Sequence, residues 1–350
     1  MEYRLKEILQ DKGYIRGPFG SSLKRNELKS TGIPVYEQQH AIYATREFRY
    51  YIDEEKYSQM KRFTVKPKDL IISCSGTIGK VDLISEKDPI GIISQALLIL
   101  RANTDIVLPE YLFYFLKSDY GYNSIISRSM GSVQVNIAKR EVIENIKINI
   151  PSLKEQEKIV KILSTIDEKI KLNNQINDNL FKIGDQLYFE NFDKYKKELP
   201  DGYRIVKLGD AVSNYDSKRK PMSSRERELH QGLYPYYGAT SIIDYVDDYI
   251  FDDTYLLMGE DGTVKTDEGY PVLQYIWGKN WINNHAHVLK GEKISTEFLV
   301  FALRKINIES MITGAVQPKI NQENMNKIEF VIGTESKNRE YENIFTNIMN

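Results

Sequence analysis

Apolar positions along the chain follow two different spacings. In residues 1–151 and again from about 200, short β-branched or aromatic runs bounded by turn residues predict strands. The clearest runs in the first stretch are 34–37, 48–52, 69–73 and 92–100. Two longer apolar stretches, 108–117 and 294–303, predict buried helices, the first with Pro109 in its first turn. Each stretch is therefore expected to form a mixed α/β unit with an irregular sheet and many loops.

Between these stretches the apolar residues return at helical spacing. Ser152 and Glu155 form an S-x-x-E capping box that opens a helix. An apolar seam then follows at intervals of four and three residues: Ile159, Leu163, Ile166, Ile170, and after a gap Ile176, Leu180, Ile183 and Leu187. No proline interrupts the pattern before Pro200. One helix over 152–191 is predicted, about 58 Å long at ~1.5 Å per residue, and so narrow a seam needs a partner helix.

The chain also repeats itself. Five motifs in the first part return in the same order in the second. Residues 32–36, 76–78, 94–96, 131–134 and 146–151 correspond to 232–236, 262–264, 284–286, 314–317 and 328–333. A repeat of this size indicates two copies of one domain. Two similar binding domains on one chain suit a target with two half-sites.

The central helix is repeated in shortened form. Its residues Ile159, Ile162, Leu163 and Ile166 correspond to Tyr341, Ile344, Phe345 and Ile348. The second helix is expected to cover the first from Ile159 to Ile166, which leaves the seam from Ile176 to Leu187 for another partner. The predicted fold is α+β: two repeated mixed α/β domains, 1–151 and 200–333, a long central helix, 152–191, and a short second helix, 334–350, in a partial antiparallel coiled coil.

Composition narrows the function classes. With 48 basic and 49 acidic residues, the net charge of −1 argues against a non-specific nucleic-acid coat. It permits sequence-specific binding if basic groups line one face. No run approaches the ~18 apolar residues of a membrane span, and no apolar signal core follows the first residues, so the cytoplasm is expected. Cys74 is the single cysteine, which excludes an internal disulfide framework and a multi-cysteine zinc site.

Two local motifs resemble parts of catalytic or metal sites, but neither fits such a site fully. Residues 73–80 resemble a phosphate-binding loop, but Cys74 stands where that motif needs glycine. A glycine loop with Lys80 facing a DNA phosphate is the better interpretation. His285 and His287 could share one strand face, yet a zinc site needs a third ligand, so a base contact by Asn284 or His285 is favoured. No metal site and no convergent acid–base cluster is evident.

Four motifs carry a family resemblance. They are Gly17-Pro18-Phe19-Gly20-Ser21-Ser22-Leu23-Lys24, the segment 68–79, Gly131-Ser132-Val133-Gln134, and the entry into the central helix, 148–159. With domain–helix–domain–helix order, the chain resembles the specificity subunit of type I restriction-modification systems. The resemblance implies two target-recognition domains that bind a split sequence in double-stranded DNA, and helices that fix the half-site separation and dock adenine methyltransferase subunits. Those partners carry S-adenosylmethionine, a motor-endonuclease subunit can join, and this chain needs no cofactor and has no catalysis of its own.

The shortened second helix departs from the family pattern and leaves self-association through the uncovered seam as a further expectation. Two other function classes stay open: a stand-alone DNA-modifying or restriction enzyme, which would need an active-site cluster, and a pure coiled-coil assembly protein, which leaves the repeated domains unexplained.

Candidate DNA contacts come from the glycine loops and from tyrosine, amide and basic side chains near them. In the first copy they are Ser21, Ser22, Lys24, Tyr36, Gln38, Ser75, Thr77, Lys80 and Gln134. In the second copy they are Lys218, Arg219, Lys220, Tyr237, Thr240, Thr263, Asn284, His285 and Gln317. Lys80 and Arg219 are expected to contact phosphates, and Gln134 and Asn284 to contact bases.

Overall fold

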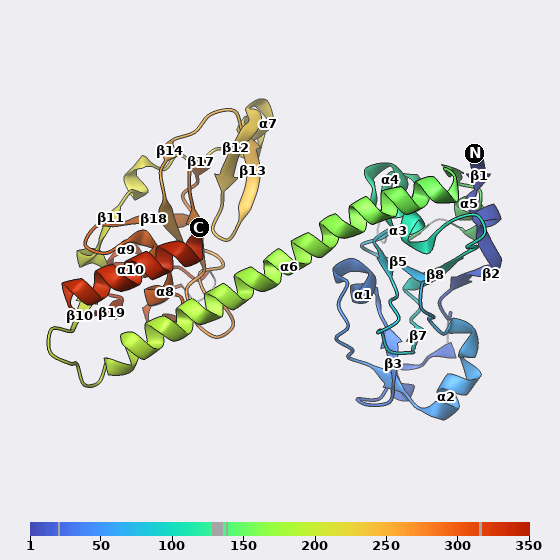
Figure 1. Cartoon of the computed structure of the whole chain (residues 1–350), viewed down its shortest axis with the longest axis horizontal. Coiled ribbons are helices and arrows are strands. Elements are labelled where there is room, and N and C mark those ends of the chain that lie inside the picture. Colours follow the sequence, from blue (N-terminus) through green and yellow to red (C-terminus); the bar gives the residue numbers. More distant parts are fainter. Residues whose placement is uncertain (20–21, 128–135, 138, 315–316) are drawn as a thin grey trace. The chain divides into compact units, whose positions relative to one another are not determined.

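The computed structural model describes residues 1–19, 22–127, 136–137, 139–314 and 317–350. The chain divides into two compact units, Met1–Lys171 and Leu172–Asn350, which follow each other from blue to red in Figure 1. Both combine sheets with helices, so the expected α+β architecture of two repeated units is confirmed. Among the described helices, none is both long and apolar enough to cross a membrane.

The two units contain the same main sheet. In the first unit its order is β2 (Leu9–Arg16), β8 (Leu97–Ala102), β5 (Leu70–Ser73), β6 (Val81–Leu83). In the second unit the order is β11 (Val212–Asn214), β18 (Ala286–Gly291), β15 (Tyr255–Gly259), β16 (Leu273–Ile276). All neighbours in both sheets are antiparallel. The repeat seen in the sequence is therefore a repeat of strand order and direction.

A second sheet accompanies each main sheet. It runs β4 (Tyr51–Ile52), β3 (Ile33–Tyr36), β7 (Ile92–Ile93) in the first unit. In the second unit it runs β13 (Ile242–Val246), β12 (Gln231–Tyr237), β17 (Lys279–Ile282), β14 (Phe251–Asp252). The pairs β3–β7 and β12–β17 are both parallel. The shorter helices are α1 (Gln38–Tyr43), α2 (Glu54–Gln59), α4 (Asp119–Ile126), α5 (Arg140–Glu144), α7 (Ser224–Leu229) and α9 (Gln322–Asn326).

One predicted strand is divided in the structure. Residues 92–100 were expected to be continuous, but Leu97 donates its N–H to the carbonyl of Ser94 in a turn. The chain leaves β7 at Ile93 and enters β8, in the other sheet, at Leu97. The polar pair Ser94 and Gln95 tolerates this turn, where an unbroken apolar strand would not. The predicted strand 48–52 is likewise reduced to Tyr51–Ile52.

Each unit is closed by pairing between its first and last strands. In the first unit β1 (Glu2–Arg4) pairs with β9 (Lys147–Asn149), and in the second β10 (Arg204–Lys207) pairs with β19 (Glu329–Ile332). A helix follows each closing strand: α6 (Leu153–Asn191) and α10 (Glu335–Met349). The predicted buried helices are confirmed as α3 (Pro109–Lys117) and α8 (Thr296–Leu303).

A buried amide fastens each closing strand to its helix. Gln156 donates through Nε2 to the carbonyl of Pro151 (3.0 Å). Asn338, at the same place in the second unit, donates through Nδ2 to the carbonyl of Gly333 (3.2 Å). Gln156 also donates to the carbonyl of Ile106 and accepts from the N–H of Leu108 at 2.8 Å. The side chain therefore joins the start of α6 to the segment that enters α3.

The central helix is one uninterrupted helix of 39 residues, as predicted. Its second half belongs to the second core through the buried Tyr188, and Phe192, directly after the helix, is buried in the same core. Gly184 lets the helix approach α8, because a Cβ atom there would lie 2.1 Å from the Phe301 ring. Leu187, predicted to be free for a partner, packs against the same core.

The second helix packs within its own unit, whereas the sequence predicted that it would cover Ile159 to Ile166. In the second unit α10 packs on α8 (Figure 1), and the tilted rings of Phe345 and Phe301 lie 4.6 Å apart, centre to centre. Its Tyr341 lies 5.2 Å from Phe192 at the end of α6. Aromatic side chains of α10 thus pack into the aromatic core of their own unit, and Ile159, Ile162 and Ile166 of α6 are exposed.

We expect Gln156→Leu to lower the free energy of unfolding of the first unit by about 1–3 kcal/mol, because buried backbone groups of Ile106, Leu108 and Pro151 lose their partner. Urea-dependent hydrogen exchange of peptides from α3 and β9 measures this. The control is Gln175→Leu, an exposed position of the same helix. Equal protection in the two variants would contradict the bridging role of Gln156.

Candidate nucleic-acid interface

Three loops meet at one edge of each main sheet. In the first unit Cys74 donates its N–H to the carbonyl of Ala96 (2.8 Å), and its own carbonyl accepts from Ile137 (3.0 Å). In the second unit Glu260 donates to the carbonyl of His285 (2.8 Å) and accepts from Ile320 (2.9 Å). The same backbone hydrogen bonds therefore hold three segments together in both units. They are the glycine loop, the turn before β8 or β18, and the segment that follows residue 134 or 317.

These bonds correct the sequence alignment by one residue. Leu97 pairs with Ser73, and Ala286 pairs with Gly259. Counting back from these pairs, Gln95 corresponds to Asn284, whereas the sequence comparison had matched Asn284 with Ser94. Both amides are exposed. An accessible Gln or Asn thus occupies the same turn in each unit.

A basic groove lies beside this edge in the first unit. One hollow of about 640 Å³ is lined by Lys12, Lys61, Arg62, Lys66 and Arg140, among other residues. A second of about 560 Å³ shares Tyr14, Arg62 and Arg140 with it and adds Phe19, Gln95, Asn136 and Lys139. Gln95 and Asn136 connect the groove to the three loops. The two hollows are therefore neighbours, and the second includes the exposed amide of the turn.

Electrostatic details of the groove suit an anionic polymer. Arg140 lies 5.1 Å from the ring centre of Tyr14, and Arg101 is neutralised by a bidentate pair with Asp69 at 2.7 Å. Burial raises the pKa of Tyr14 to about 12, so its hydroxyl remains a donor. The groove was not predicted from sequence because its cations are spread over positions 12, 61–66 and 139–140. Only the pairs Lys61-Arg62 and Lys139-Arg140 gave a local signal.

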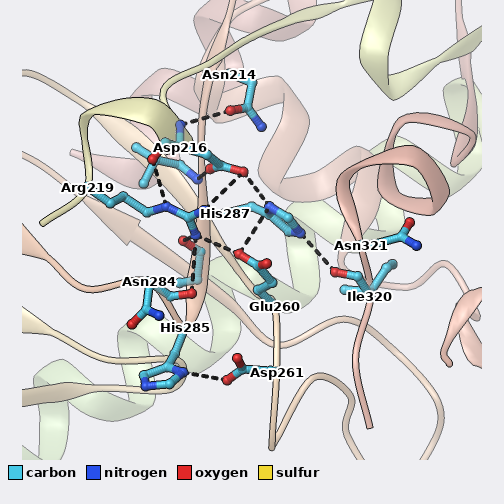
Figure 2. A network of polar contacts seen from close by, with 12 residues as sticks. Asn214, Asp216, Arg219, Glu260, Asp261, Asn284, His285, His287, Ile320 and Asn321 are labelled. Atoms are coloured by element: carbon cyan, nitrogen blue, oxygen red, sulfur yellow. Dashed lines mark hydrogen bonds and ion pairs between the residues drawn. The ribbon is translucent and has the colours of Figure 1, made fainter. Parts of the chain in front are cut away.

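A polar network occupies the corresponding edge of the second unit (Figure 2). His287 Nδ1 lies 2.6 Å from Asp216 Oδ2 and 3.7 Å from Glu260 Oε2. Its Nε2 lies 2.9 Å from the carbonyl oxygen of Ile320. Arg219 donates to Glu260 Oε2 (2.6 Å) and to the carbonyl of Ala286 (2.7 Å). The network ties the loop at 216–219 to the ends of β15 and β18.

The carboxylates of this network are held ionised. Burial alone would raise the pKa of Asp216, but hydrogen bonds from His287 and the N–H of Val288 outweigh it and lower that pKa. For Glu260 burial also acts upward, and the hydrogen bond from Arg219 with the charges of His287 and Arg219 lowers its pKa overall. Both groups are therefore anions that stabilise this edge.

The network also has the composition of a cation site. Ligand atoms of Asp216, Glu260 and His287 lie within 4.8 Å of one another. The sequence analysis found no such cluster, since these residues are far apart in the chain. However, the Arg219 guanidinium already supplies the positive charge, 2.6 Å from Glu260 and 3.5 Å from Asp216. Asp216 and Glu260 are thus paired with His287 and with Arg219.

Two predicted DNA contacts are corrected by burial. Tyr36 is fully buried, and its hydroxyl donates to the carbonyl of Pro89 at 2.7 Å, so it cannot reach DNA. The side chain of Arg219 is 13% exposed and engaged in ion pairs, so the expected phosphate contact was wrong. Tyr36 and Arg219 were predicted to contact DNA because of their residue types. The burial of each side chain depends on residues distant in sequence, so it was not predictable from the neighbouring residues.

The other candidates differ in accessibility. Exposed residues are Ser22, Lys24, Thr77, Lys80, Lys218, Lys220, Thr240, Thr263, Asn284, His285 and Gln317. Half-buried residues are Gln38, Ser75 and Tyr237. Ser21 and Gln134 lie outside the described residues. Lys80 Nζ lies 4.5 Å from the ring centre of Tyr122, and His285 Nδ1 lies 2.5 Å from Asp261, which orients the imidazole.

Two copies of an α+β unit, each closed by a terminal strand pair and followed by a helix, define the class of this protein. The chain belongs to the family of type I restriction modification DNA specificity domains, whose model matches residues 2–181 and 200–348.

Curated relatives match parts of the chain. A putative type I restriction enzyme specificity subunit of Haemophilus influenzae, S.HindORF215P, is 36% identical over 121 residues, 34% of this chain and 30% of the relative. The HindI specificity subunit of the same organism is 33% identical over 138 residues, 37% and 30% of the two chains. The MjaIX specificity subunit of Methanocaldococcus jannaschii is 29% identical over 188 residues, 47% and 41%. The chain thus matches less than half the length of each of these relatives.

Among solved structures, the type I restriction-modification S subunit from M. genitalium has the same fold. The TM-score is 0.60 at 15% sequence identity, and the match covers 100% of this chain and 89% of that one.

The polar network predicts acid sensitivity of the second unit. A carboxylate with a lowered folded pKa stabilises the fold above its ordinary pKa of ~4, and this stability is lost as pH falls through the folded value. We expect the Asp216→Asn, Glu260→Gln double variant to have a lower free energy of unfolding at neutral pH than the unmodified chain. Between roughly pH 5 and 2, the window around and below the ordinary carboxyl pKa, the variant should lose less of that free energy than the unmodified chain does.

Fluorescence of Trp277 and Trp281, the two tryptophans of the chain, reports unfolding of the second unit. Asp248→Asn, at an exposed carboxylate, is the control. An unaltered pH dependence in the double variant would show that the network does not set the acid response.

Proposed function

We propose that this chain is the DNA-specificity subunit of a type I restriction-modification complex and recognises a split sequence, one half with each unit. Residues 1–151 and 200–333 serve as the two target-recognition domains. The observation that carries the proposal is the repeated loop edge, which presents an exposed amide, Gln95 or Asn284, at the same turn of the two repeated units. Family membership and the printed names of the relatives support it.

In the first unit the basic groove supplies the phosphate contacts. Lysine and arginine side chains that neutralise phosphates release condensed counterions, which gives affinity without sequence preference. The exposed cations Lys12, Lys61, Arg62 and Lys66 serve this purpose. In the second unit the exposed Lys218 and Lys220 take this role, and Arg219 holds their loop in place.

The amide turns supply sequence discrimination. Asn and Gln side chains pair with the N6 and N7 atoms of adenine in the major groove. Gln95 lines the basic groove, and Asn284 is exposed in its turn next to the exposed His285. Both units would bind the DNA backbone in the same way. Because they carry different side chains at this turn, the two half-sites would differ in sequence.

Methyl transfer belongs to partner subunits in this proposal. Adenine methyltransferase subunits carry S-adenosylmethionine, and a motor-endonuclease subunit joins for cleavage. The exposed isoleucines of α6, including Ile170, Ile176 and Ile183, offer a surface for these partners. A stand-alone enzyme is disfavoured because the grouped acidic residues of the second unit are already neutralised by Arg219.

Loss of one groove cation should weaken binding to all sequences equally. For Arg62→Ala or Lys66→Ala we expect the slope of log K against log salt to fall by about 0.9, as for one lost phosphate contact. Fluorescence anisotropy with a labelled duplex at several salt concentrations measures the slope. Lys169→Ala, an exposed lysine of α6, serves as control. A slope identical to that of the unmodified chain would remove Arg62 and Lys66 from the interface.

The amide turns should each govern one half-site. Selection from randomised duplex DNA defines the preferred target of the unmodified chain, of Gln95→Ala and of Asn284→Ala. We expect each variant to lose discrimination at a base pair in one half only, by about 1–3 kcal/mol, with overall fold unchanged. Gln175→Ala is the matched amide control. If either single variant altered both halves, recognition would not be divided between the units.

A further inference from the structure

One half-buried cation at the loop edge of the first unit has no carboxylate partner among the described residues. It is Arg16, the last residue of β2. The other described arginines of this unit that are half-buried, Arg46 and Arg101, form ion pairs of 2.7–2.8 Å with aspartates. Arg16 instead lies against the thiol of Cys74, and its guanidinium carbon is 5.9 Å from the centre of the Phe19 ring.

Neither of these neighbours is a counter-ion for Arg16. Burial raises the pKa of the Cys74 thiol to about 12, although the charge of Arg16 acts in the opposite direction. The thiol is thus neutral near neutral pH, and the aromatic ring offers only its π face. The Nη1 nitrogen of Arg16 is buried and has no hydrogen-bond partner. A buried donor without an acceptor destabilises a fold, so folding alone does not account for an arginine at this position.

The same edge of the second unit carries carboxylates where the first unit carries this cation. Strand pairing and the loop bonds place Asp216 where the first unit has Arg16, and Glu260 where it has the thiol. Both carboxylates are paired inside the chain, with Arg219 and His287. The second unit therefore completes its network with its own side chains, whereas the first unit leaves one cation to be paired from outside.

Arg16 lines the hollow of about 560 Å³ that also includes the exposed Gln95. None of the described residues that line this hollow is acidic. The lysines of the neighbouring hollow, Lys12, Lys61 and Lys66, are exposed and so suit phosphates. A guanidinium held in the wall beside an amide suits a base edge instead, because its two parallel N–H donors match the O6 and N7 acceptors of guanine.

We infer that Arg16 binds a guanine of the first half-site, close to the base contacted by Gln95, through paired hydrogen bonds to O6 and N7. The base contact rests on the proposed function, since it names one base of the target that the first unit would bind. It also makes the two half-sites chemically unlike. The matching position of the second unit is Asp216, already paired within the chain, so no guanine contact of this kind is expected there.

The test selects targets from randomised duplex DNA with the full chain, with Arg16→Gln and with Arg16→Lys. Arg4→Gln, at an exposed arginine of β1, is the control. The unmodified chain and the control should select a guanine in the half-site that Gln95→Ala alters. Arg16→Gln should lose that preference by a factor of roughly ten or more. Arg16→Lys should lose most of it, because lysine keeps the charge but lacks the paired donors. Preferences in the other half-site should persist in every variant.

Replacing the selected guanine by 7-deazaguanine separates a base contact from a phosphate contact. The analogue lacks the N7 acceptor, so it should weaken binding by the unmodified chain and leave binding by Arg16→Gln unchanged. Anisotropy titrations at several salt concentrations should give Arg16→Gln and the unmodified chain the same slope of log K against log salt, because the substitution removes no phosphate contact.

Three results would overturn the inference. The first is a target without guanine in that half-site, or a guanine preference that persists in Arg16→Gln; recognition of a split sequence would then still stand. The second is a salt slope that falls by about 0.9 in Arg16→Gln, which would assign Arg16 to a phosphate. The third is loss of preference in both half-sites of Arg16→Gln and Arg16→Lys, which would make its role structural. If the unmodified chain preferred no sequence at all, the proposed function would fail together with the guanine contact.

Discussion

One backbone position in each unit holds the whole candidate interface together. Cys74 in the first unit and Glu260 in the second each use both the N–H and the carbonyl to bind two other loops. The glycine loop, the amide turn and the third loop would otherwise be three independent surface segments. Because these bonds involve the backbone alone, the frame does not depend on which side chains it carries.

That independence explains how one frame presents two different surfaces. In the first unit Arg16 pairs with Leu98 next to Cys74, and burial raises the pKa of that thiol to about 12, so it stays neutral. In the second unit the corresponding positions carry Asp216, His287 and Glu260. Buried polar groups must be paired to be tolerated, and Arg219 meets this requirement. The first unit thus has exposed cations that line a groove. In the second unit the cation nearest this edge, Arg219, forms ion pairs with Asp216 and Glu260.

Several features were predictable from sequence because their signals are local. The central helix follows from its capping box and seam, the buried helices α3 and α8 from unbroken apolar runs, and the repeat from ordered motifs. The one-residue error at Asn284 arose because sequence identity cannot count residues through a turn, whereas strand pairing can. The basic groove and the Asp216–Glu260–His287 network join residues that are distant in sequence, so no local pattern contained either of them in full.

The central helix was misread in a more instructive way. Its apolar residues were expected to form a seam for partner helices, but the buried residues of its two halves belong to different cores. Gln156 serves the first unit by hydrogen bonding, and Gly184, Tyr188 and Phe192 serve the second by close packing and aromatic contact. A helix that is part of two cores cannot also offer a continuous seam, because each core selects its own face. The isoleucines that remain exposed between these contacts are therefore the positions that the fold of this chain does not use, and they are the ones available for assembly with other molecules.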